Sequence, residues 1–408
     1  MHFCPLWRSA LWDDTSTRLI PWTLSFEELA VKLLYRVALL NFLLLVLEFA
    51  LCAYPAKAAD SGSAWQAEWE RTVAGAKKEG EVRLWGDAEI THPDIVAAFA
   101  KEYPSIKVVT VTGKVGDLMP RIIAERRAGK YLADLYSGGL GGRAFFDFYR
   151  AGILDPIRPA LTLSEVVDES KWLDGKHHYA DPENGYIFMY EGTPANTGLH
   201  YNAKLVNPKE FNSYRDLLSS KWKGKILVFE RLGAGSPSLV RYYYNSQLGP
   251  QFLRRLSEMD LTISQDRRQA TDWLGSGKFP LCIDCADTDR AKKQGVPVEE
   301  FDRSFLKEAA AEISTSGNSG LALINKAANP NAARVFINWF LSRRGQMIWQ
   351  EVMNAKVLEP SNSMRVDIPK DNVPPEARRE DGKRYRVTGI LDPDPVAKLV
   401  NELLGRAK

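Results

Sequence analysis

Cysteine and histidine are scarce in this chain, which has 4 Cys and 5 His among its 408 residues. A structural zinc site needs about four Cys or His ligands, and the sequence offers no second Cys pair at a suitable spacing. It also has no histidine pair with metal-ligand spacing, no Ser, His and Asp in triad order, and no nucleotide-binding fingerprint. These absences argue against enzymes that depend on such groups, and we expect no catalytic residue, no cofactor and no bound metal.

An excess of one charge is lacking as well. The 54 Lys and Arg nearly balance the 51 Asp and Glu, and the formal net charge is +3. Because no basic block is present, we expect no nucleic-acid partner. The chain also has no acidic tail of the kind that indicates disorder. With 45% hydrophobic residues, the chain is long enough to form two domains, each with its own core.

Only one long apolar run occurs, at residues 37–53 near the amino terminus. Lys32 and Arg36 precede this run, and the A-x-A sequence Ala56-Lys57-Ala58 follows it. A basic flank, an apolar core and a small-residue site are typical of a secretory signal peptide. We therefore predict that residues 1–58 are a signal peptide, cleaved near Ala58 during export.

Irregular features of this leader leave other interpretations open. Residues 1–31 precede the basic flank, which a start codon misassigned upstream, with the true start near Val31, would explain. An uncleaved transmembrane anchor is an alternative, although the run is short for a span and contains Glu48. Lipidation at Cys52 is another, although the preceding Leu51 is larger than the small residue expected there.

Removal of the leader would leave two cysteines, Cys282 and Cys285, after an apolar segment that predicts a strand. Residues three apart in an extended strand are separated by about 10 Å, which is too far for a disulfide. A bond would require a turn at Asp284. We expect two unbonded structural cysteines, with a disulfide or redox pair as the alternatives.

Helical and extended patterns alternate along the rest of the chain. Apolar residues at helical spacing precede strands predicted at 82–85, 106–111 and 133–136, and this alternation predicts a parallel sheet covered by helices. A second α/β unit, with strands predicted at 225–229 and 279–283, follows after residue 214. Small and polar residues near 191–198 and 314–320 suit two connections between the units.

Ligands of such sheets bind at the carboxyl ends of the strands, which directs attention to the loops found there. The candidate ligand-binding residues on these loops and near the first connection are Asp87, Glu89, Tyr136, Ser137, Gly138, Glu191 and Asp284. A solvated turn is the alternative for Asp87 and Glu89, and a bridge between the lobes is the alternative for Glu191. We interpret the adjacent His177 and His178 as part of an exposed loop.

The segment Arg231–Pro237 contains glycines between a predicted strand and a predicted helix. Ser236 suits the helix N-cap, and Pro237 suits the first helical position. Uncovered backbone N–H groups at this positive end of the helix form a potential anion site, to which Arg231 would add a charged partner. We therefore add Arg231, Gly235 and Ser236 to the candidates, with an ordinary capped turn as the alternative.

Five stretches resemble, in the same order, bacterial ABC-importer solute-binding proteins of the ferric-ion-type class. They are Trp65–Gly86, Ile122–Leu135, Gly198–Val206 (GLHYNAKLV), Lys221–Ile226 (KWKGKI) and Asn329–Gln346 (NPNAARVFINWFLSRRGQ). Each stretch alone is weakly specific, but the resemblance covers nearly all of residues 65–360. It implies a periplasmic protein that captures a small solute and delivers it to an ABC permease in the cytoplasmic membrane.

The resemblance also implies an α/β, two-lobed periplasmic-binding-protein-like fold of type II, with two crossover hinge strands. The ligand cleft would lie between the lobes and close by hinge motion. We expect residues 59–191 and 315–345 in lobe 1, and residues 195–312 and 346–408 in lobe 2. We further expect a monomer whose ligand is anionic or zwitterionic.

One departure from the family pattern concerns iron. Ferric-ion members place adjacent tyrosines after a strand of the second lobe, but the corresponding segment here, 283–287, contains none. Tyr242–Tyr244 lie on a different predicted helix, where successive side chains point about 100° apart and cannot converge on one ion. A ferric-ion-binding protein, a two-lobed transferase or synthase, and a membrane-anchored sensor are the alternative functions.

Overall fold

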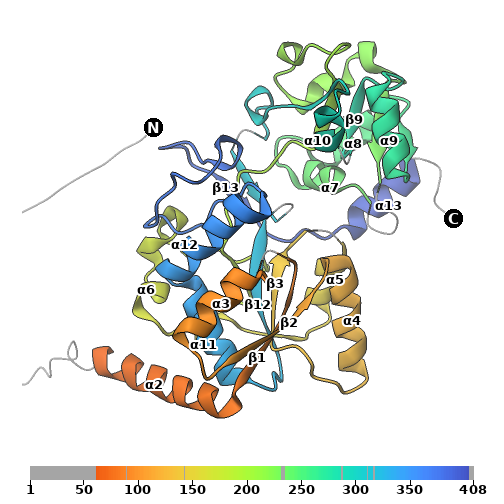
Figure 1. Ribbon diagram of the computed structural model, residues 1–408. Helices are drawn as coiled ribbons and strands as arrows, with labels where there is room; N and C mark the ends of the chain where they lie inside the picture. The colour runs from red at the N-terminus through yellow and green to blue at the C-terminus, as the bar shows by residue number, and fades with distance from the viewer. Residues whose placement is uncertain are drawn as a thin grey trace, which may run out of the picture. The chain divides into compact units, whose positions relative to one another are not determined.

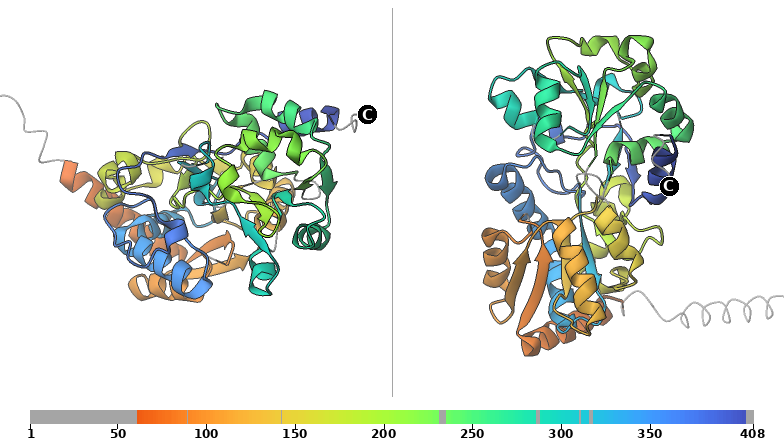
Figure 2. Two further views of the ribbon diagram at one scale, coloured as in Figure 1. Left: turned by 90° about the horizontal axis from the view of Figure 1, so that it is seen from above. Right: turned by 90° about the vertical axis from the view of Figure 1, so that its right-hand side faces the viewer.

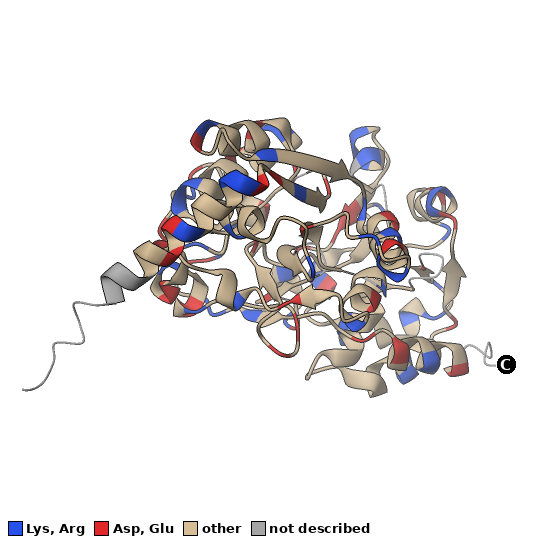
Figure 3. Cartoon of the chain, turned by 90° about the horizontal axis from the view of Figure 1, so that it is seen from below, with Lys and Arg blue, Asp and Glu red and all other residues tan. Residues whose placement is uncertain are grey.

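The computed structural model describes residues 61–403, except 89, 142, 231–234, 286–287, 310 and 316–317. The predicted leader, Glu89 and Arg231 lie outside the described residues. None of the helices within the described ranges has the length and apolar character needed to cross a membrane. Lys and Arg are interspersed with Asp and Glu over the described chain (Figure 3), as its balanced composition predicts.

The first lobe is built on a sheet with strand order β2-β1-β3-β12-β4, and β5 pairs with β12 as well. β1 is parallel to β2 and β3, whereas β12 runs antiparallel to β3. The strands are β1 (Glu81–Gly86), β2 (Lys107–Thr112), β3 (Leu135–Gly139), β4 (Leu154–Asp155), β5 (Ile187–Met189) and β12 (Ser319–Ile324). The predicted alternation of strands and helices is therefore present in this lobe.

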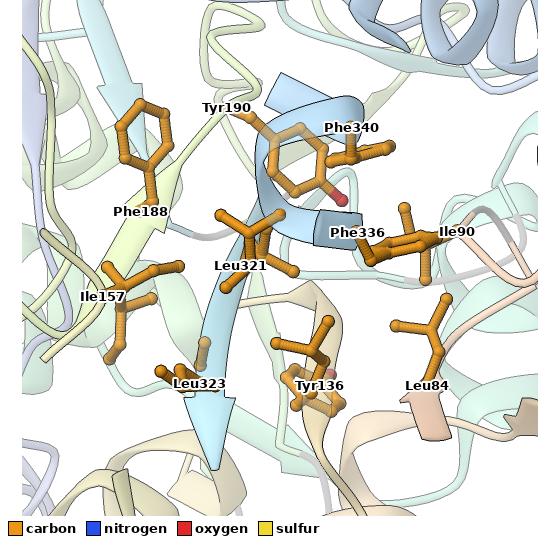
Figure 4. Close-up of a cluster of buried hydrophobic side chains, with 14 of the residues drawn as sticks. Leu84, Ile90, Tyr136, Ile157, Phe188, Tyr190, Leu321, Leu323, Phe336 and Phe340 are labelled. Carbon is orange, nitrogen blue, oxygen red and sulfur yellow. The ribbon is translucent and has the colours of Figure 1, made fainter. Parts of the chain in front are cut away.

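Helices cover both faces of this sheet (Figures 1 and 2). They are α2 (Ser61–Glu79), α3 (Pro93–Glu102), α4 (Val115–Arg127), α5 (Arg143–Arg150), α11 (Pro330–Leu341) and α12 (Arg343–Val352), with the short α6 (Ser164–Val167) beside them. Figure 4 shows part of the core, where Leu321 of β12 lies near Phe336 of α11, while Tyr136 of β3 packs on Phe145 of α5. Burial of these apolar side chains holds the helices against the sheet.

The second lobe contains a sheet with strand order β10-β6-β9-β7-β8, in which β7 is parallel to β8 and β9. Its strands are β6 (Leu199–Asn202), β7 (Ile226–Phe229), β8 (Thr262–Ser264), β9 (Leu281–Ile283) and β10 (Val298–Glu300). Its helices are α7 (Pro237–Tyr244), α8 (Gly249–Ser257), α9 (Arg267–Gly275), α10 (Thr288–Lys293) and α13 (Asp394–Leu403). Separate apolar clusters pack on this sheet, so each lobe has its own core.

Short helical turns connect these elements. The 3-10 turns lie at Arg158–Ala160, Glu169–Lys171, Leu173–Gly175, Pro208–Glu210, Tyr214–Leu218, Ser220–Trp222, Arg303–Phe305 and Pro375–Ala377, and a π-helical turn spans Met353–Val357. Two of them lie near His177 and His178, which are buried rather than exposed as predicted. Their Nε2 atoms lie 2.8 Å from Val166 O and 3.0 Å from Leu173 O, so the backbone of the preceding turns satisfies both rings.

Three passages of the chain connect the two sheets. The first crossing, residues 190–198, leads from β5 to β6, and the second leads from β11 (Glu312–Ser314) to β12. The third passage, which the sequence did not predict, contains β13 (Arg386–Thr388), and this strand pairs in parallel with β11. It carries the chain to α13 in the second lobe.

The boundary predicted for the carboxyl-terminal part differs from the structure. Residues 346–408 were expected in lobe 2, but Trp349, Met364 and Tyr385 pack in the core of the first lobe. Only α13, through Val396 and Leu399, joins the second core. The reason is local, because one serine, Ser342, ends α11 and caps α12, so the chain has no linker there in which to change lobes.

Candidate ligand-binding site

The loops at the carboxyl ends of β1 and β3 meet through Asp87. Its Oδ2 accepts a hydrogen bond from the Gly139 N–H at 2.9 Å. Gly138 has a φ of 146°, and a Cβ atom at this position would lie only 2.2 Å from Asp87 Oδ2. Glycine is therefore required for the carboxylate to approach the end of β3. The structure brings these predicted residues together at the edge of the first sheet.

Tyr136 and Ser137 are buried beside this loop, and the Tyr136 hydroxyl donates to Gly139 O at 3.4 Å. Both side chains are 0% exposed. The Tyr136 ring packs 5.8 Å from that of Phe145, and Ser137 Oγ lies 3.0 Å from the hydroxyl oxygen of Tyr190. Since β3 is covered on both faces, these side chains belong to the core. Their burial favours Gly138 among the three as the residue that reaches a ligand, and ligand contact by any of them stays a prediction.

Glu191 lies at the start of the first crossing and is 3% exposed. Its Oε1 accepts a hydrogen bond from the Thr193 hydroxyl, and its Oε2 accepts one from the Ser319 N–H, each at 3.0 Å. The residue also forms an isolated β-bridge with Ser363. Burial raises the pKa of Glu191 to about 7. The carboxyl group therefore ties the start of the first crossing to β12, and a bridge between the lobes stays a prediction.

Asp284, at the end of β9, is bound to the N-terminus of α7. Its carboxylate accepts hydrogen bonds from the Ser236 hydroxyl, the Ser238 N–H at 2.9 Å and the Ser238 hydroxyl at 2.6 Å. The Leu239 N–H donates to Ser236 Oγ at 3.2 Å, which confirms Ser236 as the N-cap. The Ser238 and Leu239 N–H groups therefore already have acceptors, whereas residues 231–234 of the predicted anion site lie outside the described residues, and that site stays a prediction.

The turn that places Asp284 includes a disulfide. Cys282 and Cys285 are bonded, with their Cα atoms 5.8 Å apart, so the expectation of two unbonded cysteines is wrong. An extended strand would separate them too far, but Asp284 has a φ of 59°. Aspartate tolerates this left-handed conformation better than most residues. The reversal at Asp284 thus closes the distance and directs the carboxylate toward α7.

Arg241 is a residue of this region that the sequence patterns did not indicate. It is 9% exposed, and it donates hydrogen bonds to Asn196 O at 2.7 Å and Thr197 O at 3.1 Å. It also donates to Ser238 Oγ at 3.0 Å. The guanidinium therefore ties α7 to the first crossing. One feature of the sequence could have indicated Arg241. It is an arginine three residues after Ser238, among the aromatic and aliphatic side chains of the helix.

A large cavity among the described residues lies elsewhere, along the first crossing. This crossing groove has a volume of about 1600 Å³. It is lined by Thr193–Thr197, by Glu300–Ser304, by Asn318 and by residues 360–385, a segment that we call the strap. None of the residues predicted for the ligand site lines it. The crossing groove is thus a cavity apart from the strand-end loops, where the ligand site was predicted.

Comparison with known proteins identifies the class to which these features belong. The profile of the bacterial extracellular solute-binding proteins matches residues 87–347, and the chain belongs to this family. It is therefore a solute-binding protein, as the sequence resemblance implied. No curated protein sequence matches the chain.

Solved structures of similar fold include several binding proteins. IdiA (FutA) of Trichodesmium, with iron and citrate, has 18% identity, covers 80% of this chain and 99% of its own, and gives a TM-score of 0.55. Iron-bound HitA of Pseudomonas aeruginosa has 17% identity, coverage of 79% and 99%, and a TM-score of 0.52. The spermidine/putrescine ABC transporter protein PotD of Streptococcus pneumoniae has 14% identity, coverage of 80% and 99%, and a TM-score of 0.51. These likenesses confirm the predicted two-lobed α/β fold.

Proposed function

We propose that this protein is the exported solute-capturing component of an ABC importer, with its ligand site at the strand-end loops. The family and the fold support this proposal, as does the presence of importer proteins among the similar structures. The proposal includes a periplasmic location after cleavage near Ala58 and delivery of the solute to a membrane permease. It includes no catalytic step.

The observation that carries the proposal is the way the two crossings are bound to each other. The Thr193 N–H donates to Asn318 Oδ1 at 2.8 Å, and the Ala195 N–H donates to Glu312 O at 2.7 Å. Two paired extended segments between separate cores are a suitable hinge. A solute that contacts the strand-end loops of both lobes would favour the closed arrangement by its differential affinity.

The ligand's charge must be reconsidered in the light of Asp284. The sequence predicted an anionic or zwitterionic solute because of the α7 N-terminus, but Asp284 uses donors of that turn. A solute bound at the strand-end loops of both lobes would therefore meet two carboxylates, Asp87 and Asp284. We propose that this site binds a cationic or hydrogen-bonding part of the solute, and that any anionic part is bound by other donors.

Iron is bound in two of the similar structures, which makes a ferric ion the second candidate ligand. In this chain, however, the segment 283–287 has no tyrosine to provide phenolate oxygens, and Cys285 is in the disulfide. Within the described ranges, no group of three or more His, Cys, Asp or Glu side chains could hold a metal ion. We therefore favour an organic solute.

Native mass spectrometry of the protein secreted with its own leader tests this function. A co-purified solute should add mass under non-denaturing conditions and be released on denaturation. Gly138→Ala should reduce solute retention at least about tenfold, because the new Cβ atom displaces Asp87. Gly129→Ala is the matched control, since Gly129 also has a positive φ but a Cβ atom there would meet nothing within 4 Å.

Small-angle scattering provides an independent measurement of hinge closure. The radius of gyration should decrease when the identified solute is added to solute-free protein. An unchanged scattering profile at saturation, together with equal retention by both glycine variants, would contradict the proposed function.

A further inference from the structure

Two basic side chains of the strap converge on one backbone oxygen at the wall of the crossing groove. Arg379 Nη2 and Lys370 Nζ donate to Ser363 O at 2.9 Å and 2.8 Å. Arg379 Nη1 also donates to Gly192 O at 2.7 Å, and Lys370 donates to Gln350 Oε1 at 3.0 Å. Both residues line the groove. The charge of Arg379 disfavours the protonated form of Lys370 at this short distance, and the effect is stronger away from bulk water.

Lys370 and Arg379 interact electrostatically with Asp367 and Asp174, respectively, but neither contact is an ion pair. Their acceptors are neutral backbone and amide oxygens, and in the described part of the chain neither forms an ion pair with a carboxylate. Burial, followed by the charge of Arg379, lowers the pKa of Lys370 to about 6. Burial also lowers the pKa of Arg379 to about 10. An anion bound beside these two side chains would favour the protonated form of Lys370, because an opposite charge stabilises the charged state.

Donor groups remain available at both side chains. Arg379 uses one hydrogen of each terminal nitrogen for Gly192 and Ser363, which leaves Nε–H and the other hydrogens without a bond to any described residue. The backbone is shaped to admit the guanidinium, since a Cβ atom at Gly192 would lie 2.8 Å from Arg379 Nη1. Lys370 donates two of its three hydrogens. The planar fork of arginine suits an oxyanion.

Carboxylates also line the groove, but their positions differ from those of the two cations. Glu376, Glu380 and Asp381 are exposed, and Glu380 is paired with Lys383 at 2.6 Å. Glu300, on the opposite wall, accepts hydrogen bonds from the Gly198 N–H and the Thr197 hydroxyl. Exposed charges are screened by water and salt, whereas half-buried ones are screened much less.

We infer that Arg379 and Lys370 form a binding site for an oxyanion group, such as a phosphate, sulfate or carboxylate, in the crossing groove. The bound group would bridge the two cations in place of a protein carboxylate. Since Arg379 also holds Gly192 of the first crossing, an occupied site would connect the strap to the hinge. The site is separate from the strand-end loops and does not depend on the solute bound there.

Titration of solute-free protein with inorganic phosphate, followed by calorimetry at constant ionic strength, tests this site. Wild-type protein should show saturable binding of phosphate. Arg379→Gln and Lys370→Gln should each weaken it at least about tenfold, the scale of a lost charged hydrogen bond. Lys383→Gln is the matched control, because Lys383 lines the same groove but is already paired with Glu380. It should keep the affinity within about twofold.

Two further controls distinguish a failure of the phosphate site from a failure of the solute site or of folding. Gly138→Ala should bind phosphate as wild type does, even where it loses the transported solute, so that failure of one site is distinguishable from failure of the other. Circular dichroism and urea unfolding of each variant establish that it folds. If only one of Arg379→Gln and Lys370→Gln folds, that variant alone provides the test. The inference is overturned if chloride at equal ionic strength reproduces the effect, or if the folded cation variants bind phosphate like wild type.

Discussion

The carboxylate of Asp284 is bound to Ser238 twice, through the backbone N–H at 2.9 Å and through the hydroxyl group at 2.6 Å. Ser238 lies in the first turn of α7, where N–H groups have no acceptor within the helix and the dipole favours negative charge. An internal anion from the end of β9 thus occupies the position that the sequence pattern assigned to a ligand. The same contact connects the disulfide turn to the helix that Arg241 ties to the first crossing.

Asp284→Ala should therefore destabilise the protein. The change leaves the Ser238 N–H and two serine hydroxyls without their acceptor, and we expect the free energy of unfolding to fall by about 1–3 kcal/mol. Urea unfolding measures this loss. Glu359→Ala, at an exposed position, is the control and should change the free energy by less than about 0.5 kcal/mol. Equal stability of the two variants would exclude a capping role for Asp284.

Reduction of the Cys282–Cys285 bond should also lower stability. A loop this short contributes about 2 kcal/mol through the entropy of the unfolded chain. Urea unfolding with and without a reductant measures the effect, and intact mass after alkylation reports the state of the cysteines. In the Cys282→Ser, Cys285→Ser double variant, the reductant should have no effect. A similar loss in that variant would show that the reductant acts elsewhere.

The stability of the wild-type protein should fall as pH rises through neutrality, because of Glu191. Burial raises its folded-state pKa to about 7, from an ordinary value of 4.5, so the folded protein holds the proton more tightly than the unfolded chain. The corresponding stability is present below about pH 4.5 and is lost as pH rises through about 7. By pH 8 the difference amounts to about 3 kcal/mol.

Glu191→Gln mimics the protonated side chain and should remove this dependence. We expect the variant to be more stable than wild type at pH 8 and similar to it at pH 5. Urea unfolding at both pH values measures the difference, with Glu351→Gln as the exposed control. Parallel pH profiles of wild type and Glu191→Gln would contradict the assignment.

Amino-terminal sequencing of the protein recovered from the periplasm tests export. The A-x-A sequence before Ala59 predicts a mature chain that begins near this residue. A variant with Ala58 changed to Glu should accumulate as the longer precursor, because signal peptidase requires a small residue there. Recovery of residues 1–58 on the wild-type exported protein would support the anchored alternative.

Much of the fold could be predicted because its signals are local. The apolar segment before Gly86 forms β1, and the pattern after His92 forms α3, whose N-cap is His92. Short elements such as β13 were not predicted. The three residues of β13 are too few to show the alternating apolar pattern of a strand. They form a strand because β11 lies beside them and pairs with them.

The candidate site was predicted less completely, because its contacts join distant parts of the chain. Asp284 and Ser238 are 46 residues apart, and Arg241 and Asn196 are 45 apart. When only the residues next to it in the sequence are considered, each of these residues is consistent with several roles. Tyr136 and Ser137, for example, follow the pattern of a strand end, but the layers packed on β3 bury both.

The sequence by itself determined two α/β units, their connecting segments and the family, because apolar periodicity and short motifs depend on residues near each other in the chain. Tertiary structure alone decided that Asp284 fills the N-terminus of α7 and that Cys285 reaches Cys282. It also decided that the strap places Arg379 and Lys370 on one carbonyl oxygen. Hydrogen bonds and charge interactions act over a few ångströms in space, and only the folded backbone establishes which groups lie within that distance.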